Sequence, residues 1–373
     1  MNPETIDLLS RLPPPPSTVP GRFTIAIPTF NRATFLRRSL RAALSQAHKD
    51  VEVLVCDNAS TDDTRAVVSE FGSRVRYYCH DRNRGAVANW ELAPNLATGE
   101  YFSWLQDDDL IHREFASRAG AALEASEVCR VYSCYLAYGS SDTTYISQHI
   151  YGAGLPLDWQ AGATRSFGSR EIAAVGFFHN LGLPPGLAFR TSAIREGLLR
   201  LPSDCDLYVE RLIPLVVAGD GSYVVEPWLG GLFFSHEHQY SRALIKSNLS
   251  KTHWIAMARR LGEIIQAAND DSWIGFMTDL FRQMSVADRI NWLRDEHTAS
   301  IDWRAVHPVA HLARTLLIDS LPAAARERTK KRSGFREVVK ECVPPLILKT
   351  AFRMRNYFRA KIYLADTIER SQR

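Results

Sequence analysis

The feature that most constrains the fold is an alternation of short apolar runs with helical patterns between residues 23 and 105. Residues 23–28 and 51–56 are β-branched, apolar runs of the kind buried in parallel sheets. Between them, residues 34–47 place apolar side chains at the spacing of one helix face. Helices are predicted again over 61–71 and 86–96, and strands over 75–79 and 101–105. This pattern predicts a doubly wound α/β sheet that binds ligands at the carboxyl ends of its strands.

The alternation is looser after residue 109. We expect a helix over 112–127, strands over 128–138, 187–190 and 222–225, and a helix over 205–218. The Gly- and aromatic-rich stretch that ends at residue 186 is long and irregular, which is typical of a binding loop.

Three regions follow from this organisation. The run Pro13 to Pro16 is too stiff to pack as a helix or a sheet, so the ordered domain is expected to begin after Gly21. Beyond residue 241 the pattern is almost wholly helical. We therefore predict a proline-rich N-terminal extension over 1–21, an α/β domain over 22–240 and a helical, basic C-terminal region over 241–373.

The composition is that of a soluble globular protein, with 46% hydrophobic and 23% charged residues. No stretch reaches the roughly 18 consecutive apolar residues of a membrane-spanning helix, and the N-terminus lacks the pattern of a secretion signal. The six cysteines form no CxxC pair. We therefore expect reduced thiols and a cytoplasmic location.

Polar and aromatic residues follow three of the predicted strands. The first strand ends in Pro-Thr-Phe-Asn-Arg at 28–32, the second leads into Asp-Asn-Ala-Ser at 57–60, and the fourth into Gln-Asp-Asp-Asp at 106–109. An aromatic ring can stack on a base, an aspartate can accept from the N–H of a base, and a cation can offset phosphate charge. This edge of the predicted sheet is therefore equipped for a nucleotide.

Three successive aspartates, Asp107, Asp108 and Asp109, indicate a bound cation, because like charges at close range raise one another's pKa. Hard oxygen ligands that leave room for phosphate oxygens suit Mg²⁺ or Mn²⁺. His236 and His238 offer a further ligand. A solvated acidic turn that caps the next helix is the weaker interpretation, because the aspartates follow an apolar strand.

Taken in order, these motifs resemble the family 2 glycosyltransferases of the GT-A fold over about residues 22–241. The resemblance implies a GT-A, Rossmann-like nucleotide-sugar-binding domain with a mixed sheet. It also implies transfer of one sugar from a nucleotide-sugar donor to an acceptor hydroxyl. The motifs are Ile-Pro-Thr-Phe-Asn-Arg at 27–32, Asp-Asn-Ala-Ser-Thr-Asp at 57–62, Asn-Arg-Gly at 83–85 followed by Asn89, the aspartates at 107–109, Ser-Asp-Cys-Asp at 203–206, and His236 with Ser241.

The resemblance assigns the nucleotide-sugar site to residues from the strand ends and one loop. The first strand end would frame the base and phosphates, Asp57 would accept a hydrogen bond from the base, and Asn83 would lie near the nucleotide. The implied set is Pro28, Thr29, Phe30, Arg32, Asp57, Asn83 and Asp107.

The metal motif departs from the usual Asp-x-Asp form of the family, since Gln106 stands before the three aspartates. In the register that we prefer, Asp107 faces the ribose and Asp108 holds the metal. The competing register uses Asp107 and Asp109. The implied metal ligands are therefore Asp108 and Asp109, with His236 as a metal or diphosphate contact.

The catalytic base of the family lies in an acidic pair that opens a helix in the acceptor half. Ser203 occupies the glutamate place here, which leaves Asp204 as the matching carboxylate. In an inverting transfer Asp204 would take the proton of the acceptor hydroxyl. Asp206 fits a capping box with Ser203 and is the structural member of the segment.

Local alternatives remain open for several of these residues. Asp57 and Ser60 also fit an Asx turn that caps the following helix, and Phe30 fits a core position. Asn83 and Asn89 fit a turn and a helix surface.

The C-terminal region is basic. Residues 241–373 hold 24 Lys and Arg against 14 Asp and Glu, whereas the first 240 residues carry a net charge of −6. Apolar residues over 347–362 repeat at helical spacing among Lys and Arg, as in a basic amphipathic helix. This pattern predicts either contact of residues 343–365 with an anionic membrane surface or docking of the helix on the catalytic domain. We expect no nucleic-acid binding, because no recognisable motif accompanies the charge.

The favoured function is a hexosyl- or deoxyhexosyl-type, non-processive glycosyltransferase for a surface polysaccharide or other glycoconjugate. Its acceptor would be a glycan or a lipid-linked glycan, met in the cytoplasm at the inner face of the membrane. The chain lacks the Gln-x-x-Arg-Trp motif of processive synthases. The alternatives are a sugar nucleotidyltransferase, although residues 28–34 contain no glycine, and a non-catalytic nucleotide- or glycan-binding module, suggested by Ser203.

Overall fold

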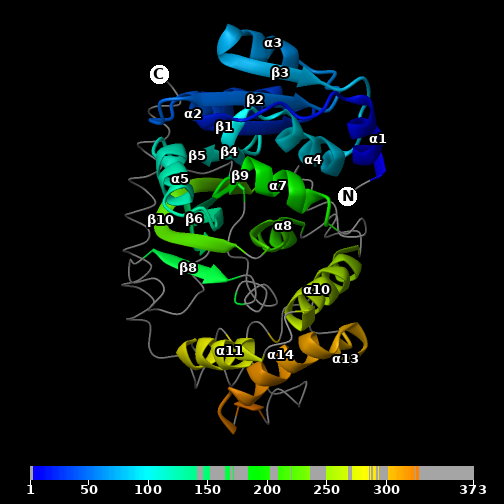
Figure 1. Cartoon of the computed structure of the whole chain (residues 1–373), viewed down its shortest axis with the longest axis vertical. Helices are drawn as coiled ribbons and strands as arrows, with labels where there is room; N and C mark the ends of the chain where they lie inside the picture. Colours follow the sequence, from blue (N-terminus) through cyan, green and yellow to red (C-terminus); the bar gives the residue numbers. More distant parts are fainter. Residues whose placement is uncertain are drawn as a thin grey trace.

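The computed structural model (Figure 1) describes residues 3–140, 146–151, 164–168, 184–201, 209–219, 221–235, 249–267, 271–284, 301–323 and single positions at 171, 286, 289, 290, 293, 325 and 326. Its strands form one sheet in the order β3-β2-β1-β4-β9-β6-β10-β5, with β7 paired to β6 and β8 to β10. The strands are β1 Val19–Thr29, β2 Val51–Asp57, β3 Val75–Cys79, β4 Gly99–Trp104, β5 Leu110–Ile111, β6 Cys129–Ser140, β7 Ile146–Tyr151, β8 Arg165–Gly168, β9 Leu187–Arg190 and β10 Ser222–Ser235.

The two halves of the sheet differ in strand direction. Strands β3, β2, β1 and β4 are parallel, which confirms the alternation predicted for residues 23–105. Strand β9 runs antiparallel to both β4 and β6, and β5 runs antiparallel to β10. The sheet is therefore mixed, as the sequence resemblance implied.

Helices cover both faces of the sheet because alternate residues of its strands point to opposite sides. Phe23, Ile25 and Ile27 of β1 pack in one cluster with helices α2, α3 and α5, whereas Ala26 packs in the other with α4, α7 and α8. These helices are α2 Ala33–Leu44, α3 Thr64–Ser69, α4 Ala86–Leu96, α5 Phe115–Glu124, α7 Thr191–Leu198 and α8 Val209–Ala218.

In the described part of the chain, four further helices extend the second face beyond α8 (Figure 1) and confirm the helical C-terminal region. Trp254, Met257 and Leu261 belong to the same apolar cluster as Leu212 and Val216 of α8, so the core continues past residue 240. No helix in the described part of the chain is long and apolar enough to cross a membrane. The helices are α10 Leu249–Ala267, α11 Ser272–Gln283, α13 Trp303–Val306 and α14 Pro308–Asp319.

The N-terminal extension contains a helix that the sequence analysis did not predict. Pro3–Arg11 form α1, which packs against α4 with Thr5 and Leu8 buried. The proline run lies outside any helix or strand, as expected, but β1 begins at Val19 and not after Gly21. The strand starts early because the Val19 N–H donates to Thr98 O at 2.8 Å. The exposed Val-Pro-Gly sequence at 19–21 has no apolar pattern from which this pairing could be predicted.

The part of the chain after residue 109 contains more regular structure than its pattern suggested. β10 reaches Ser235, whereas the sequence analysis predicted a strand only over 222–225. Its pairing with β6 shifts register between Glu226 and Leu229 and again before Gly231, and such bulges break the alternation on which a strand prediction rests. Helix α7 and the short strand β5 were also missed.

Candidate functional site

The carboxyl ends of β1, β2 and β4 lie side by side. Thr29 pairs with Asp57 in the β1–β2 register, and the Leu105 N–H donates to Ala26 O at 2.9 Å as the chain leaves β4. The structure thereby brings six of the predicted binding residues to one edge of the sheet: Pro28, Thr29, Phe30, Arg32, Asp57 and Asp107.

Arg32 stands between two buried carboxylates at this edge. Its Nη1 lies 3.2 Å from Asp107 Oδ1 and 2.5 Å from Asp108 Oδ2. The Thr29 hydroxyl donates to the second oxygen of Asp107 at 2.7 Å. Burial raises the pKa of Asp107 to about 7, and the positive charge of Arg32 opposes that shift. The positive charge of Arg32 therefore favours the ionised form of Asp107.

Asp109 lies deeper than its two neighbours and points toward β10. Its Oδ1 accepts from the Phe234 N–H at 2.8 Å, and its Oδ2 is buried without a hydrogen-bond partner in the described part of the chain. Burial and the charge of Asp108 raise the pKa of Asp109 well above its usual range. Ser39 Oγ of α2 lies 2.8 Å from Asp107 O and 2.9 Å from Asp109 O, which holds the turn on α2.

Asp57 is buried at the end of β2 with both carboxylate oxygens engaged. Oδ1 accepts from the Ser60 N–H at 2.9 Å, and Oδ2 accepts from the Tyr77 hydroxyl at 2.5 Å. Each carboxylate oxygen has two lone-pair positions, so the group can still accept a hydrogen bond from a ligand. The Asx turn considered as an alternative is present, and it coexists with a buried acceptor at the sheet edge.

The loop that carries Phe30 is fixed to the loop after β2. The Asn31 N–H donates to Ser60 Oγ at 2.8 Å, and Asn31 Oδ1 accepts from the Thr61 N–H at 2.7 Å. Asn31 has a positive φ of 53°. The ring of Phe30 is left exposed beside the strand ends rather than packed in the core.

Asn83 reaches the same edge from the loop after β3. Asn58, next to Asp57, donates from Nδ2 to Asn83 Oδ1 at 2.9 Å, and the Gly85 N–H donates to the same oxygen at 2.8 Å. Asn89 is not a helix-surface residue: it is buried, donates to Cys56 O at 2.9 Å and faces His80 Nε2 at 3.0 Å.

Gln106, which stands directly before the three aspartates, has a defined orientation that the sequence did not reveal. Trp90 Nε1 donates to Gln106 Oε1 at 3.2 Å, and an indole N–H is only a donor. The amide nitrogen of Gln106 therefore points away from the indole. Trp90 itself stacks on Trp104 with ring centroids 4.2 Å apart. Nothing in a helical apolar pattern distinguishes such a tryptophan from a core residue.

Four predicted residues of the acceptor half, Asp204, Asp206, His236 and His238, lie outside the described residues, as does the segment 343–365. The structure places Asp108 and Asp109 next to each other but turned to different surroundings. No group of three or more His, Cys, Asp or Glu side chains arranged for a metal occurs among the described residues.

The donor set nevertheless fits a small, hard cation that is shared with a ligand. Asp107 and Asp108 already share the charge of Arg32, and Asp109 Oδ2 is a buried oxygen without a partner in the described ranges. Mg²⁺ commonly binds through one or two carboxylates together with substrate phosphates. Two aspartates are therefore sufficient protein ligands for Mg²⁺ or Mn²⁺ in the presence of a diphosphate.

The segment of the chain that forms this edge of the sheet is similar to a known protein family. Residues 24–193 match the family model described as Glycosyl transferase family 2. An uncharacterized glycosyltransferase of Rickettsia bellii is 35% identical over 91 residues, 24% of this chain and 13% of that protein. GalNAc(5)-diNAcBac-PP-undecaprenol beta-1,3-glucosyltransferase of Campylobacter jejuni is 32% identical over 92 residues, 24% of this chain and 30% of that protein. The similar segment spans less than a third of either relative.

Among solved structures, that of S. aureus TarS 1-349 in complex with UDP-GlcNAc has a TM-score of 0.48 at 14% identity, and covers 84% of this chain and 93% of that one. The family match and the mixed sheet with helices on both faces identify the GT-A architecture that the motifs implied. Residues 24–193 of this chain therefore match glycosyl transferase family 2, and β10 completes the sheet to which they belong.

Proposed function

We propose that this protein transfers a single sugar from a nucleotide-diphosphate sugar to a hydroxyl of a glycan or lipid-linked glycan. The reaction would be assisted by Mg²⁺ or Mn²⁺, would invert the anomeric configuration and would be non-processive. The transferred unit would be a hexose or a deoxyhexose, for a surface polysaccharide or other glycoconjugate.

The observation that carries the proposal is the juxtaposition of two different recognition groups at one sheet edge. Asp57 is a buried acceptor suited to the N–H of a base, and the cluster of Arg32 with Asp107 and Asp108 is suited to a charged diphosphate and its cation. Both belong to adjacent strand ends, so one nucleotide diphosphate can reach both. The exposed ring of Phe30 lies beside them and offers a stacking surface for the base.

Each described residue has a task in this proposal. Arg32 lies where it can exchange its carboxylate partners for phosphate oxygens, Thr29 orients Asp107, and Pro28 lies one residue before the end of β1, at the edge itself. Asp108, with Asp109 behind it, would hold the divalent cation. When bound, that cation would stabilise the negative charge of the departing diphosphate.

The proton of the acceptor hydroxyl needs a base, and we propose Asp204 for this task. In an inverting transfer the acceptor oxygen bonds to the anomeric carbon while the bond from that carbon to the diphosphate oxygen breaks. The diphosphate leaves with the electron pair, and Asp204 takes the hydroxyl proton. Positioned base catalysis contributes about 10²- to 10⁴-fold in rate.

The acceptor and the location are proposed from two supports. The Campylobacter jejuni relative is named for an undecaprenol-linked glycan acceptor. The basic amphipathic pattern over 343–365 suits an anionic membrane surface, at which a lipid-linked acceptor would be met. Vesicle co-sedimentation of the full chain and of a chain ending at residue 342 tests this part, and equal binding to anionic vesicles would exclude it.

The decisive experiment for the function is nucleotide binding followed by turnover. Calorimetry with UDP, GDP, CDP and dTDP, each with Mn²⁺ and with EDTA, should show metal-dependent binding of at least one nucleotide. Asp204→Asn should then lose about 10² or more in transfer rate with that nucleotide's sugar while the donor affinity stays the same. Asp206→Asn is the matched control, and an inactive Asp206→Asn beside an active Asp204→Asn would move the base by two residues.

A further inference from the structure

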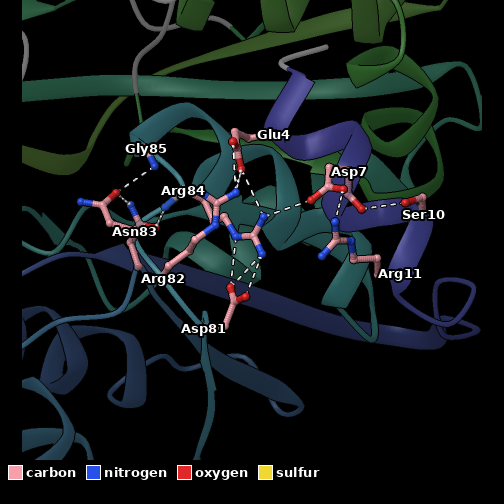
Figure 2. A network of polar contacts seen from close by, with 10 residues as sticks. Glu4, Asp7, Ser10, Arg11, Asp81, Arg82, Asn83, Arg84 and Gly85 are labelled. Carbon is pink, nitrogen blue, oxygen red and sulfur yellow. Dashed lines mark hydrogen bonds and ion pairs between the residues drawn. The ribbon is translucent and has the colours of Figure 1, made fainter.

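Helix α1 is joined to the loop after β3 by a second charged cluster, which we call the N-terminal clasp: Glu4, Asp7, Asp81 and Arg84. Figure 2 shows Glu4 and Asp7 of α1 pointing toward the Arg84 guanidinium. Arg84 Nη1 lies 3.2 Å from Glu4 Oε2 and 3.1 Å from Asp7 Oδ2. Its Nε and Nη2 donate to Asp81 at 2.8 to 3.1 Å. The guanidinium is thus held on both edges, and its side chain is only 3% exposed.

The backbone of Arg84 is tied to the sheet edge at the same time. Its N–H donates to Asn58 Oδ1 at 2.8 Å, and Asn58 Nδ2 donates to Asn83 Oδ1. The Asn58 N–H in turn donates to Thr29 O at 3.0 Å. One residue therefore connects α1, through its side chain, with the strand ends of the donor edge, through its backbone.

Helix α1 is itself held on a rigid neighbour. Thr5 is fully buried and donates to Glu91 of α4, and Leu8 is buried beside it. Glu4 also pairs with Arg82 at 3.1 Å, so two arginines of the loop reach α1. The loop ends at Gly85, whose φ of 85° is a backbone conformation that residues with a side chain rarely adopt. Side-chain contacts thus decide where this loop lies.

We propose that α1 is part of the donor site and that the N-terminal clasp positions Asn83 for the nucleotide. The inference rests on the proposed function, in which Asn83 lies beside the bound nucleotide. Helix α1 precedes the segment 24–193 that matches the family model, so Glu4 and Asp7 lie outside the matched segment, whereas Asp81 and Arg84 lie within it. Glu4, Asp7 and Arg84 are positioning residues: they act on the nucleotide through the loop.

The test is a double variant, Glu4→Gln with Asp7→Asn, which removes the two charges that α1 contributes and keeps side-chain size. The matched control, Glu263→Gln with Asp279→Asn, removes two exposed carboxylate partners of arginines on α10 and α11. Because the two altered carboxylates, Glu4 and Asp7, lie at the surface, the variant is expected to fold. The single variant Glu4→Gln, which leaves Asp7 and Asp81 on Arg84, provides a milder second version.

Calorimetry with UDP, GDP, CDP and dTDP in Mn²⁺ gives the first readout. For the nucleotide that the unaltered protein binds, we expect the clasp variant to bind about fivefold more weakly and the control to bind equally well. In turnover assays KM for the donor should rise while kcat stays constant. Hydrogen exchange gives the second readout, since the Arg84 and Gly85 amides should exchange faster in the free variant and slow again when nucleotide binds.

The outcomes separate the two proposals. If the unaltered protein binds none of the four nucleotides, the proposed function is overturned and the inference falls with it. If the unaltered protein binds and the clasp variant binds equally tightly while its loop amides exchange faster, only the inference is overturned. A fall in melting temperature without a change in affinity or KM likewise reduces the clasp to a structural contact.

Discussion

Two arginine–carboxylate clusters in this protein are built in opposite ways. At the sheet edge formed by the ends of β1, β2 and β4, the carboxylates of Asp107 and Asp108 are 7% exposed and Arg32 is 22% exposed. In the N-terminal clasp the arginine is buried, whereas the side chains of Glu4 and Asp81 are 40% and 68% exposed.

The difference indicates what each cluster can do. Buried carboxylates cannot be rehydrated when they lose their cation, so Asp107 and Asp108 require one, while a partly exposed Arg32 can give way to another. The exposed carboxylates of the clasp stay hydrated if Arg84 is removed, so the loss of that ion pair costs them little free energy. The buried Arg84 guanidinium, in contrast, depends on all of these carboxylates for its hydrogen bonds. The first arrangement suits exchange of ligands, and the second suits holding two chain segments together.

The largest expected effect comes from the buried carboxylates. Asp108→Asn should weaken Mn²⁺-dependent nucleotide binding by about 10²-fold or more, because it removes a charged ligand from a site with few others. Asp109→Asn should weaken it less, since one Asp109 oxygen already accepts from Phe234 N–H. Calorimetry with Mn²⁺ measures both, and a larger loss in Asp109→Asn would favour the competing register.

The second prediction concerns the removal of Arg32, the positively charged side chain between Asp107 and Asp108. Arg32→Gln should lower the free energy of unfolding by about 3 kcal/mol in EDTA, because two buried carboxylates are left without their partner. Mn²⁺ should restore part of the loss. Urea denaturation with and without Mn²⁺ measures it, and Arg32→Lys, which keeps the charge, is the control. Absence of any rescue by Mn²⁺ would count against a cation site here.

The third prediction concerns the removal of Arg84, the positively charged side chain of the clasp. Arg84→Gln leaves solvated carboxylates behind, so its loss of stability should be roughly half that of Arg32→Gln or less. Mn²⁺ should not restore it. The same denaturation series measures both variants, and a rescue of Arg84→Gln by Mn²⁺ would erase the distinction between the clusters.

The smallest effect concerns His80, a buried residue that directly follows β3. Burial, and secondarily the charge of Arg84, lower the pKa of His80 below its ordinary value of 6.5, despite the hydrogen bond with Asn89. At pH values between the folded pKa and 6.5, His80 is therefore protonated in the unfolded chain and neutral in the folded protein. Its contribution to stability is complete above pH 6.5 and is lost as the pH falls toward the lower, folded pKa.

The test compares the unaltered protein with His80→Gln between pH 7 and 5.5. The unaltered protein should lose up to about 1 kcal/mol more stability than the variant over this range. Taking the difference between the two proteins removes the contributions of the other titrating groups. Parallel stability curves would show that His80 is free to protonate in the folded state.

Much of the structure up to residue 109 was predictable from local patterns. Helix α4 has the bounds that the apolar spacing predicted, 86–96, and the strand ends meet as parallel strands must. Motif residues such as Asp57 and Asp107 follow strands directly, so the sheet topology alone brings them together. The part of the chain after residue 109 was less predictable, because bulges in β10 break the alternation of inward- and outward-facing residues along that strand.

The sequence by itself determined the alternating α/β order, the strand-end motifs and the chemistry those residue types offer. Only the tertiary structure decided which of them are buried and what each one contacts. Asp109 contacts Phe234, Trp90 orients Gln106, and Glu4 contacts Arg84, and these pairs lie 125, 16 and 80 residues apart in the chain. Local patterns record the period of a helix or strand, whereas the partner of a buried polar group is chosen by packing, since each such group must find one when water is excluded.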